Sequence, residues 1–158
     1  MVVSKRRRGR QMAVQMLFQS DLGGASVDDI LQHFDPAEYL LHEPTEGEER
    51  DGDPEQLGRA FEFAERLLRG SLEHREEIDA VIGAQAENWR LERMPVVDRN
   101  ILRLAVYELL YESDVPHLVV VDEAIELAKQ FGSEQSGRFI NGLLDGVLKS
   151  RPLPGTNR

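Results

Sequence analysis

Apolar residues recur along most of this chain at intervals of three and four residues, and this spacing restricts the fold more than any other feature. The clearest stripe consists of Leu57, Phe61, Ala64, Leu68 and Leu72, separated by steps of 4, 3, 4 and 4 residues. Steps of this size place side chains on one face of an α-helix, whereas a half-buried strand would require strict alternation. The stretch therefore predicts a long amphipathic helix.

Capping residues, glycines and prolines divide the rest of the chain into similar segments. Ser4, Ser26 and Ser133 are suitable N-caps, Pro54 is a suitable first helical residue, and Gly132 is a suitable stop. The expected helices cover about residues 5–22, 27–34, 36–42, 54–82, 96–113, 118–131 and 134–151. The run "LVVV" (118–121) would also suit a buried strand, but the residues after it keep helical spacing. We therefore predict an all-α protein with about seven helices and no sheet.

Charge is distributed unevenly along the 158 residues, whose formal net charge is −10. Five of the 19 Lys and Arg residues fall within residues 1–10, so the other 148 residues carry 14 cations against 29 carboxylates, a net −15. A body of this charge repels a polyanion, so any phosphate contact must be local. The length predicts a single domain over 1–158 with a basic segment, 1–10, and an acidic loop, 43–55.

Composition also bears on location. The chain has no cysteine, which fits a reducing compartment. Its basic start lacks the apolar segment of a secretory signal, and no apolar run approaches the length of a membrane span. We expect a cytoplasmic protein.

No catalytic or metal-binding motif stands out. The four histidines (His33, His42, His74 and His117) lack a metal-ligand spacing, and there is no phosphate-binding loop or nucleophile elbow. We therefore predict no enzymatic activity, no metal and no cofactor.

The arginine block at the start of the chain is not explained by core packing. Arg6, Arg7, Arg8 and Arg10 precede or enter the first turn of a helix, where cations oppose the helix dipole. Two interpretations of the block remain open: a solubilising tail and a phosphate-binding surface. The second is favoured by the planar guanidinium, which suits bidentate contacts with phosphate.

A second stretch with binding potential is "FGSEQSGRFING", residues 131–142. Hydrogen-bonding side chains, among them Gln135, gather there near a helix N-terminus, which offers free N–H groups to phosphate. Phe139 is suited either to the core or to stacking on a base.

Three stretches together resemble the NusB family of bacterial transcription antitermination factors. They are "RRRGRQMAVQMLFQ" at the start, "MPVVDRNILRLAVYELL" in the middle and "DVPHLVVVDEAIELAKQFGSEQSGRFINGLLDGVL" near the end. The resemblance implies two packed helical subdomains and no catalysis. It also implies binding of boxA-type single-stranded RNA together with NusE, the ribosomal protein S10, within the antitermination complex of RNA polymerase, in support of ribosomal RNA transcription.

The resemblance also assigns the residues of the expected sites. The family's arginine-rich RNA-binding start corresponds to Arg6, Arg7, Arg8 and Arg10, to which we add Lys5. Phe139 matches an RNA-contacting aromatic position. Gln135 lies where the usual family pattern has an aspartate. The glutamine side chain can still form hydrogen bonds, but it lacks the negative charge.

Contacts with NusE are implied for three residues. Glu92 and Asp98 match acidic positions that face NusE, and Phe18 retains the ring, but not the hydroxyl, of a common aromatic. We expect the acidic body to steer a basic partner while the amino-terminal block binds RNA.

Two alternatives belong to other functional classes. The first is the RNA-binding domain of a ribosomal RNA methyltransferase, because such enzymes carry NusB-like helical domains, but the chain ends at Arg158 without a Rossmann-type module. The second is a helical scaffold that binds only proteins. The sequence leaves open whether the protein is a monomer or a homodimer.

Overall fold

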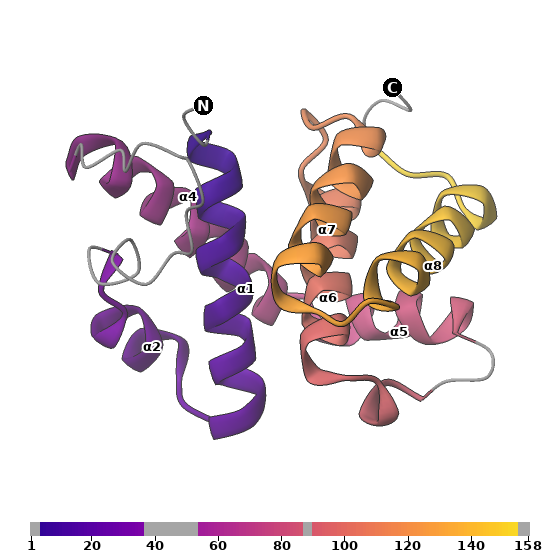
Figure 1. Cartoon of the computed structure of the whole chain (residues 1–158), viewed down its shortest axis with the longest axis horizontal. Coiled ribbons are helices and arrows are strands. Elements are labelled where there is room, and N and C mark those ends of the chain that lie inside the picture. The colour runs from indigo at the N-terminus through magenta and orange to yellow at the C-terminus, as the bar shows by residue number, and fades with distance from the viewer. Residues whose placement is uncertain (1–3, 37–53, 87–89, 155–158) are drawn as a thin grey trace. The chain divides into compact units, whose positions relative to one another are not determined.

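A computed structural model describes residues 4–36, 54–86 and 90–154 of the chain. Within these ranges the protein consists of seven α-helices and one short 3-10 helix, with no strand, as the apolar spacing predicts. The chain divides into two compact units, Met1–Arg69 and Gly70–Arg158. Figure 1 shows the helices of both, and each unit is described separately below.

Unit 1 contains α1 (Lys5–Gly23), α2 (Val27–His33) and most of α4 (Pro54–Glu73). The predicted caps are confirmed for the first two helices: the hydroxyl of Ser4 accepts the Arg7 N–H at 3.1 Å, and that of Ser26 accepts the Asp29 N–H at 3.2 Å. Gly24 ends α1 with φ +65°, the left-handed conformation that favours glycine. Local hydrogen bonding therefore fixes the ends of α1 and the start of α2.

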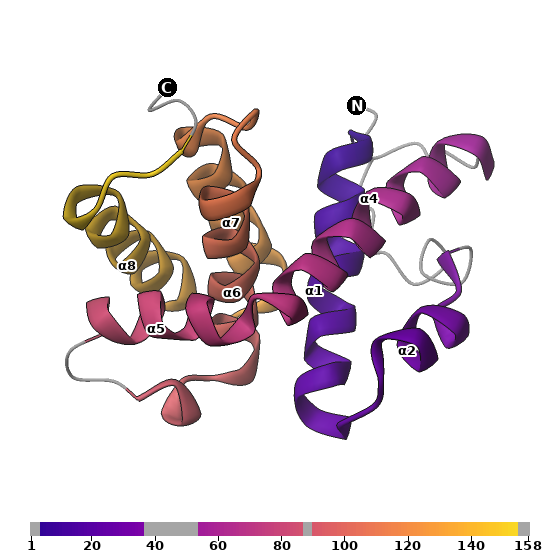
Figure 2. The same ribbon diagram turned by 180° about the vertical axis from the view of Figure 1, so that it is seen from behind.

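Helices α1 and α4 cross closely in unit 1 (Figure 2). A Cβ at Gly9 would lie 2.6 Å from Phe63 Cδ2 and 3.0 Å from the Ala60 carbonyl oxygen, so glycine is needed for this approach. Around the crossing lies the apolar interior of the unit. Its buried members include Met12, Ala13, Met16, Leu17, Ala60, Ala64 and Leu67.

Unit 2 contains α5 (Arg75–Gln85), the 3-10 helix η1 (Leu91–Arg93), α6 (Val96–Tyr111), α7 (His117–Phe131) and α8 (Ser136–Ser150). Helix α6 contacts α5, α7 and α8, and its wide apolar face accounts for this central position. The "LVVV" run lies in α7, and Gly132 follows its last residue, as predicted.

Two predicted helix boundaries are wrong. The long helix from Pro54 ends at Glu73, and a separate helix follows His74. Helix α8 begins at Ser136 with Gln135 as its N-cap residue, so Ser133 is not the cap. The Ser133 N–H instead donates to the hydroxyl of Ser136.

Part of the predicted loop and of one predicted helix lies outside the described residues. Of the acidic segment 43–55, the structure describes only Pro54 and Glu55, which form the start of α4. Of the predicted helix over 36–42, it describes only Pro36.

Candidate nucleic-acid interface

The arginine block is helical. Helix α1 begins at Lys5, so the reading of a basic tail does not apply to Lys5 and the residues after it. Lys5, Arg6 and Arg7 are exposed, whereas Arg8 and Arg10 are only 6% and 3% exposed. Because a buried guanidinium requires partners inside the protein, the exposed cations are the better placed to bind an external anion.

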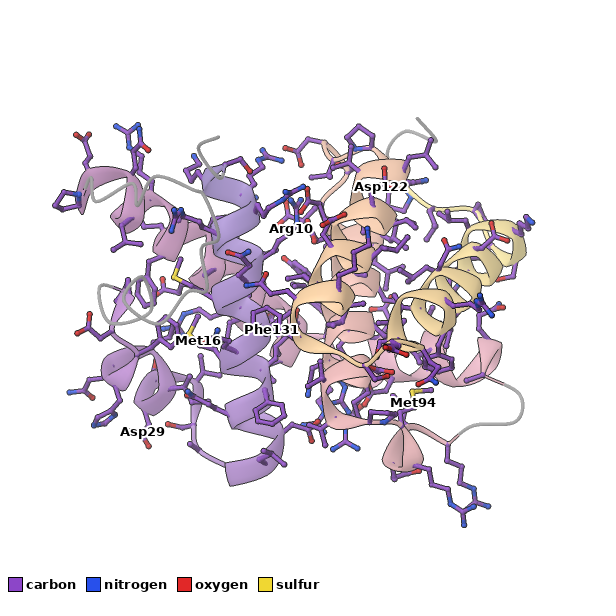
Figure 3. All side chains as sticks on the ribbon, viewed as in Figure 1. Arg10, Met16, Asp29, Met94, Asp122 and Phe131 are labelled. Carbon is purple, nitrogen blue, oxygen red and sulfur yellow. The ribbon has the colours of Figure 1, made fainter. Side chains whose placement is uncertain are left out.

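An aromatic ring of α4 gathers three of the arginines of unit 1. The guanidinium carbons of Arg6, Arg10 and Arg66 lie 5.6, 5.7 and 5.3 Å from the ring centroid of Phe63. These distances fall within the range of cation–π attraction. Figure 3 shows Arg10 projecting from α1. Arg66 could not be predicted from the sequence, because nothing in the spacing of α4 connects it with residues of α1.

The turn before α8 carries the other predicted RNA-binding residues. Gln135 is exposed at the N-cap of α8, and Phe139 is partly buried one turn later. A Cβ at Gly132 would lie 2.5 Å from Ser136 Oγ and 2.9 Å from the Ala128 carbonyl oxygen, so this tight turn requires glycine. The arginine block belongs to unit 1 and this turn to unit 2, and a bipartite site made of both stays a prediction.

The three predicted partner-binding residues have different environments. Glu92 is exposed in η1, and Phe18 is partly buried on α1. Asp98 is only 4% exposed, and its Oδ1 accepts a 2.7 Å hydrogen bond from Ser136 Oγ. The structure thus gives the Asp98 carboxylate an internal role that sequence reasoning missed, while its contact with a partner stays a prediction.

Comparison with known proteins decides the family. A protein-family model described as "NusB family" matches residues 7–149, which is most of the chain. The chain belongs to the NusB family. The resemblance seen in the three sequence stretches is therefore confirmed.

Relatives that are named transcription antitermination protein NusB match nearly the whole chain. The protein from Anaeromyxobacter dehalogenans is 46% identical over 151 residues, which cover 96% of this chain and 95% of the relative. The protein from Geobacter sulfurreducens is 43% identical over 150 residues, which cover 95% and 98%.

Solved NusB structures share the fold. NusB of T. maritima has a TM-score of 0.73 and 38% identity over 96% of this chain and 94% of that one. A structure of the antitermination factors NusB and NusE in complex with dsRNA matches with a TM-score of 0.72 and 26% identity, over 93% and 98%. The predicted all-α, NusB-like fold is confirmed.

The described residues contain no group of three or more His, Cys, Asp or Glu side chains that could hold a metal ion. None of their helices is both long enough and apolar enough to cross a membrane.

Proposed function

We propose that this NusB-family chain is an RNA-binding transcription antitermination factor without catalytic activity. The observation that carries the proposal is its match, at 46% identity over 96% of the chain, to a protein named transcription antitermination protein NusB. The exposed cations Lys5, Arg6 and Arg7 support it, because they give an acidic chain one local surface for phosphate. A cytoplasmic location, where bacterial transcription takes place, is part of the proposal.

The proposed ligands are boxA-type RNA and NusE, bound together within the antitermination complex during ribosomal RNA transcription. Support comes from the structure of NusB and NusE with dsRNA, which this chain matches over 93% of its length. Phosphate contacts should then dominate the affinity for RNA. Stacking of a base on Phe139 would add affinity with little preference for one base over another.

The two surfaces divide by charge in this proposal. Lys5, Arg6 and Arg7 at the start of α1 bind RNA phosphates, with Gln135 and Phe139 as contacts from the turn before α8. Glu92 and Phe18 contact NusE. The body of net charge −15 attracts a basic ribosomal protein over long range, which raises the association rate more than the final affinity.

A gel-shift titration with boxA RNA tests the proposal. The protein is titrated with and without NusE at two salt concentrations, beside a scrambled RNA of equal length. We expect tighter binding to boxA RNA, further tightening by NusE, and weakening by salt with a slope of roughly −0.7 per phosphate neutralised.

Replacing Arg6 and Arg7 together by glutamine should flatten that slope. Binding of neither RNA, with or without NusE, would contradict the proposal and favour a protein-only scaffold. Preference for structured ribosomal RNA over boxA RNA would favour the domain of a methyltransferase instead.

A further inference from the structure

Three arginines from two helices converge on one ring in unit 1. Arg6 and Arg10 come from α1 and Arg66 from α4, and all three lie within 5.7 Å of the Phe63 centroid. We call these four residues the Phe63 cluster. The family resemblance implies a role for the α1 arginines but none for Arg66.

The packing of the two helices builds this cluster. Gly9 brings α1 against Phe63, and the two α1 arginines stand one turn apart on either side of that glycine. Arg66 follows Phe63 by three residues on α4, so it projects from the same face of that helix. The convergence therefore depends on backbone geometry as well as on the lengths of the side chains.

Placing like charges together has an electrostatic cost. The guanidinium carbons of Arg6 and Arg66 lie within 5.6 Å of a common centroid, so they cannot be further apart than twice that distance. Both side chains are exposed, so this repulsion is weak at physiological ionic strength, where the Debye length is about 8 Å, and stronger at low salt. The ring's negative face offsets some of the repulsion, and an anion bound between the two guanidiniums would offset more.

We propose that Arg66 is an RNA-phosphate ligand that shares one stretch of RNA backbone with Arg6. Both side chains are exposed, whereas Arg10, which is 3% exposed, supports the ring from within. The RNA-binding surface thus extends from the start of α1 onto α4. The planar fork of arginine suits this role, because two parallel N–H groups can bind one phosphate. This inference rests on the proposed RNA-binding function.

Helix α4 supplies a matched control. Arg69 is exposed, one turn after Arg66, and its Nη2 lies 3.0 Å from Asp28 Oδ1 of α2. Replacing either arginine by glutamine removes one positive charge from the same helix, but only Arg66 belongs to the Phe63 cluster. A difference in RNA binding between Arg66→Gln and Arg69→Gln is therefore due to the position of the lost charge and not to the change in net charge.

The experiment measures the dissociation constant of boxA RNA, with NusE present, across a series of salt concentrations. We expect Arg66→Gln to weaken binding several-fold at low salt and to reduce the slope of log K against log salt by roughly 0.7, the value for one phosphate. Arg66→Lys should restore the slope, because it keeps the charge. Arg69→Gln should change the slope by much less.

Arg6→Gln separates failure of this inference from failure of the proposed function. If the unaltered protein binds RNA and Arg6→Gln lowers the slope, an unchanged slope in Arg66→Gln overturns only the role of Arg66. Equal losses of RNA affinity in Arg66→Gln and Arg69→Gln also overturn the role of Arg66. So does an Arg66→Gln variant that binds NusE more weakly but binds RNA as before. If the unaltered protein fails to bind RNA, both proposals fall.

Discussion

The hydroxyl of Ser136, the first residue of α8, donates a 2.7 Å hydrogen bond to Oδ1 of Asp98 in the first turn of α6. The same hydroxyl accepts the N–H of Ser133 at 2.9 Å. Asp98 and Ser136 are 4% and 1% exposed, so both polar groups are satisfied inside unit 2. The pair ties the turn that carries Gln135 to the central helix, which makes Asp98 a positioning residue for that turn.

Removal of the Asp98 carboxylate should destabilise the protein. In Asp98→Ala the buried Ser136 hydroxyl loses its acceptor, at an expected cost of about 1–3 kcal/mol in the free energy of unfolding. Urea denaturation measures this cost. Glu92→Ala is the control, because this exposed side chain should change stability by no more than about 0.5 kcal/mol. Equal stabilities for the two variants would contradict the internal role.

The serine distinguishes positioning by Asp98 from direct contact with NusE. If Asp98 acts through the turn, Ser136→Ala should weaken RNA binding to a similar extent as Asp98→Ala, while NusE binding without RNA stays unchanged in both. RNA and NusE titrations of the two variants decide between the roles. Loss of NusE affinity in Asp98→Ala alone would instead support direct contact.

A side chain at Gly9 should disturb the crossing of α1 and α4. The Cβ of Gly9→Ala would meet both the Phe63 ring and the backbone oxygen of Ala60, and overpacking of this kind costs about 1–3 kcal/mol. Alanine gains about 1 kcal/mol of helix propensity, so the net effect should be a modest destabilisation. Gly58→Ala in α4 meets no atom within 4 Å and should stabilise the protein. Urea midpoints of both variants test this, and a more stable Gly9→Ala would show that the crossing can relax.

A partly buried ion pair links α5 to α6. The Nε and Nη2 of Arg103 donate to the two carboxylate oxygens of Asp79 at 2.9 and 3.1 Å, and Arg103 is 6% exposed. Asp79→Ala leaves a buried guanidinium without this partner, so we expect a loss of about 3 kcal/mol in unfolding free energy. Asp145→Ala, which breaks an exposed pair with Lys149, should cost under about 0.5 kcal/mol. Thermal unfolding of both variants measures the two losses, and an equal loss in Asp79→Ala and Asp145→Ala would contradict the prediction.

The sequence predicted what short-range chemistry decides. Ser4 and Ser26 cap their helices through their own backbone neighbours, and Pro54 starts α4, so these positions followed from a few adjacent residues. The start of α8 was missed, and the contacts of its first residue are partly long-range. The Ser136 hydroxyl binds Asp98, 38 positions earlier in the chain, and local spacing gives no indication of this contact.

The candidate site shows the same division. The exposed cations at the start of α1 were visible as a charge run, and the family resemblance gave them a role. The burial of Arg8 and Arg10 was not visible, because it depends on packing around α1. Arg66 was missed for a similar reason: its neighbours in sequence are ordinary α4 residues, and only the approach at Gly9 brings it to the same ring as Arg6.

The burial of Asp98 leaves Glu92 as the predicted acidic NusE contact that is exposed. Reversing its charge should slow NusE association several-fold at low salt, because the local field that attracts a basic partner is weakened. The difference should shrink as salt is raised, since exposed charges are screened. Stopped-flow association rates across a salt series measure both effects.

Glu55→Lys changes the net charge of the protein by the same amount at an exposed site on α4, and it serves as the control. Equal slowing by Glu55→Lys and Glu92→Lys would mean that NusE responds only to total charge. An unchanged rate for Glu92→Lys at low salt would remove η1 from the partner surface. A specific contact requires that Glu92→Lys alone also raises the dissociation rate, because steering acts on association and a local contact acts on both.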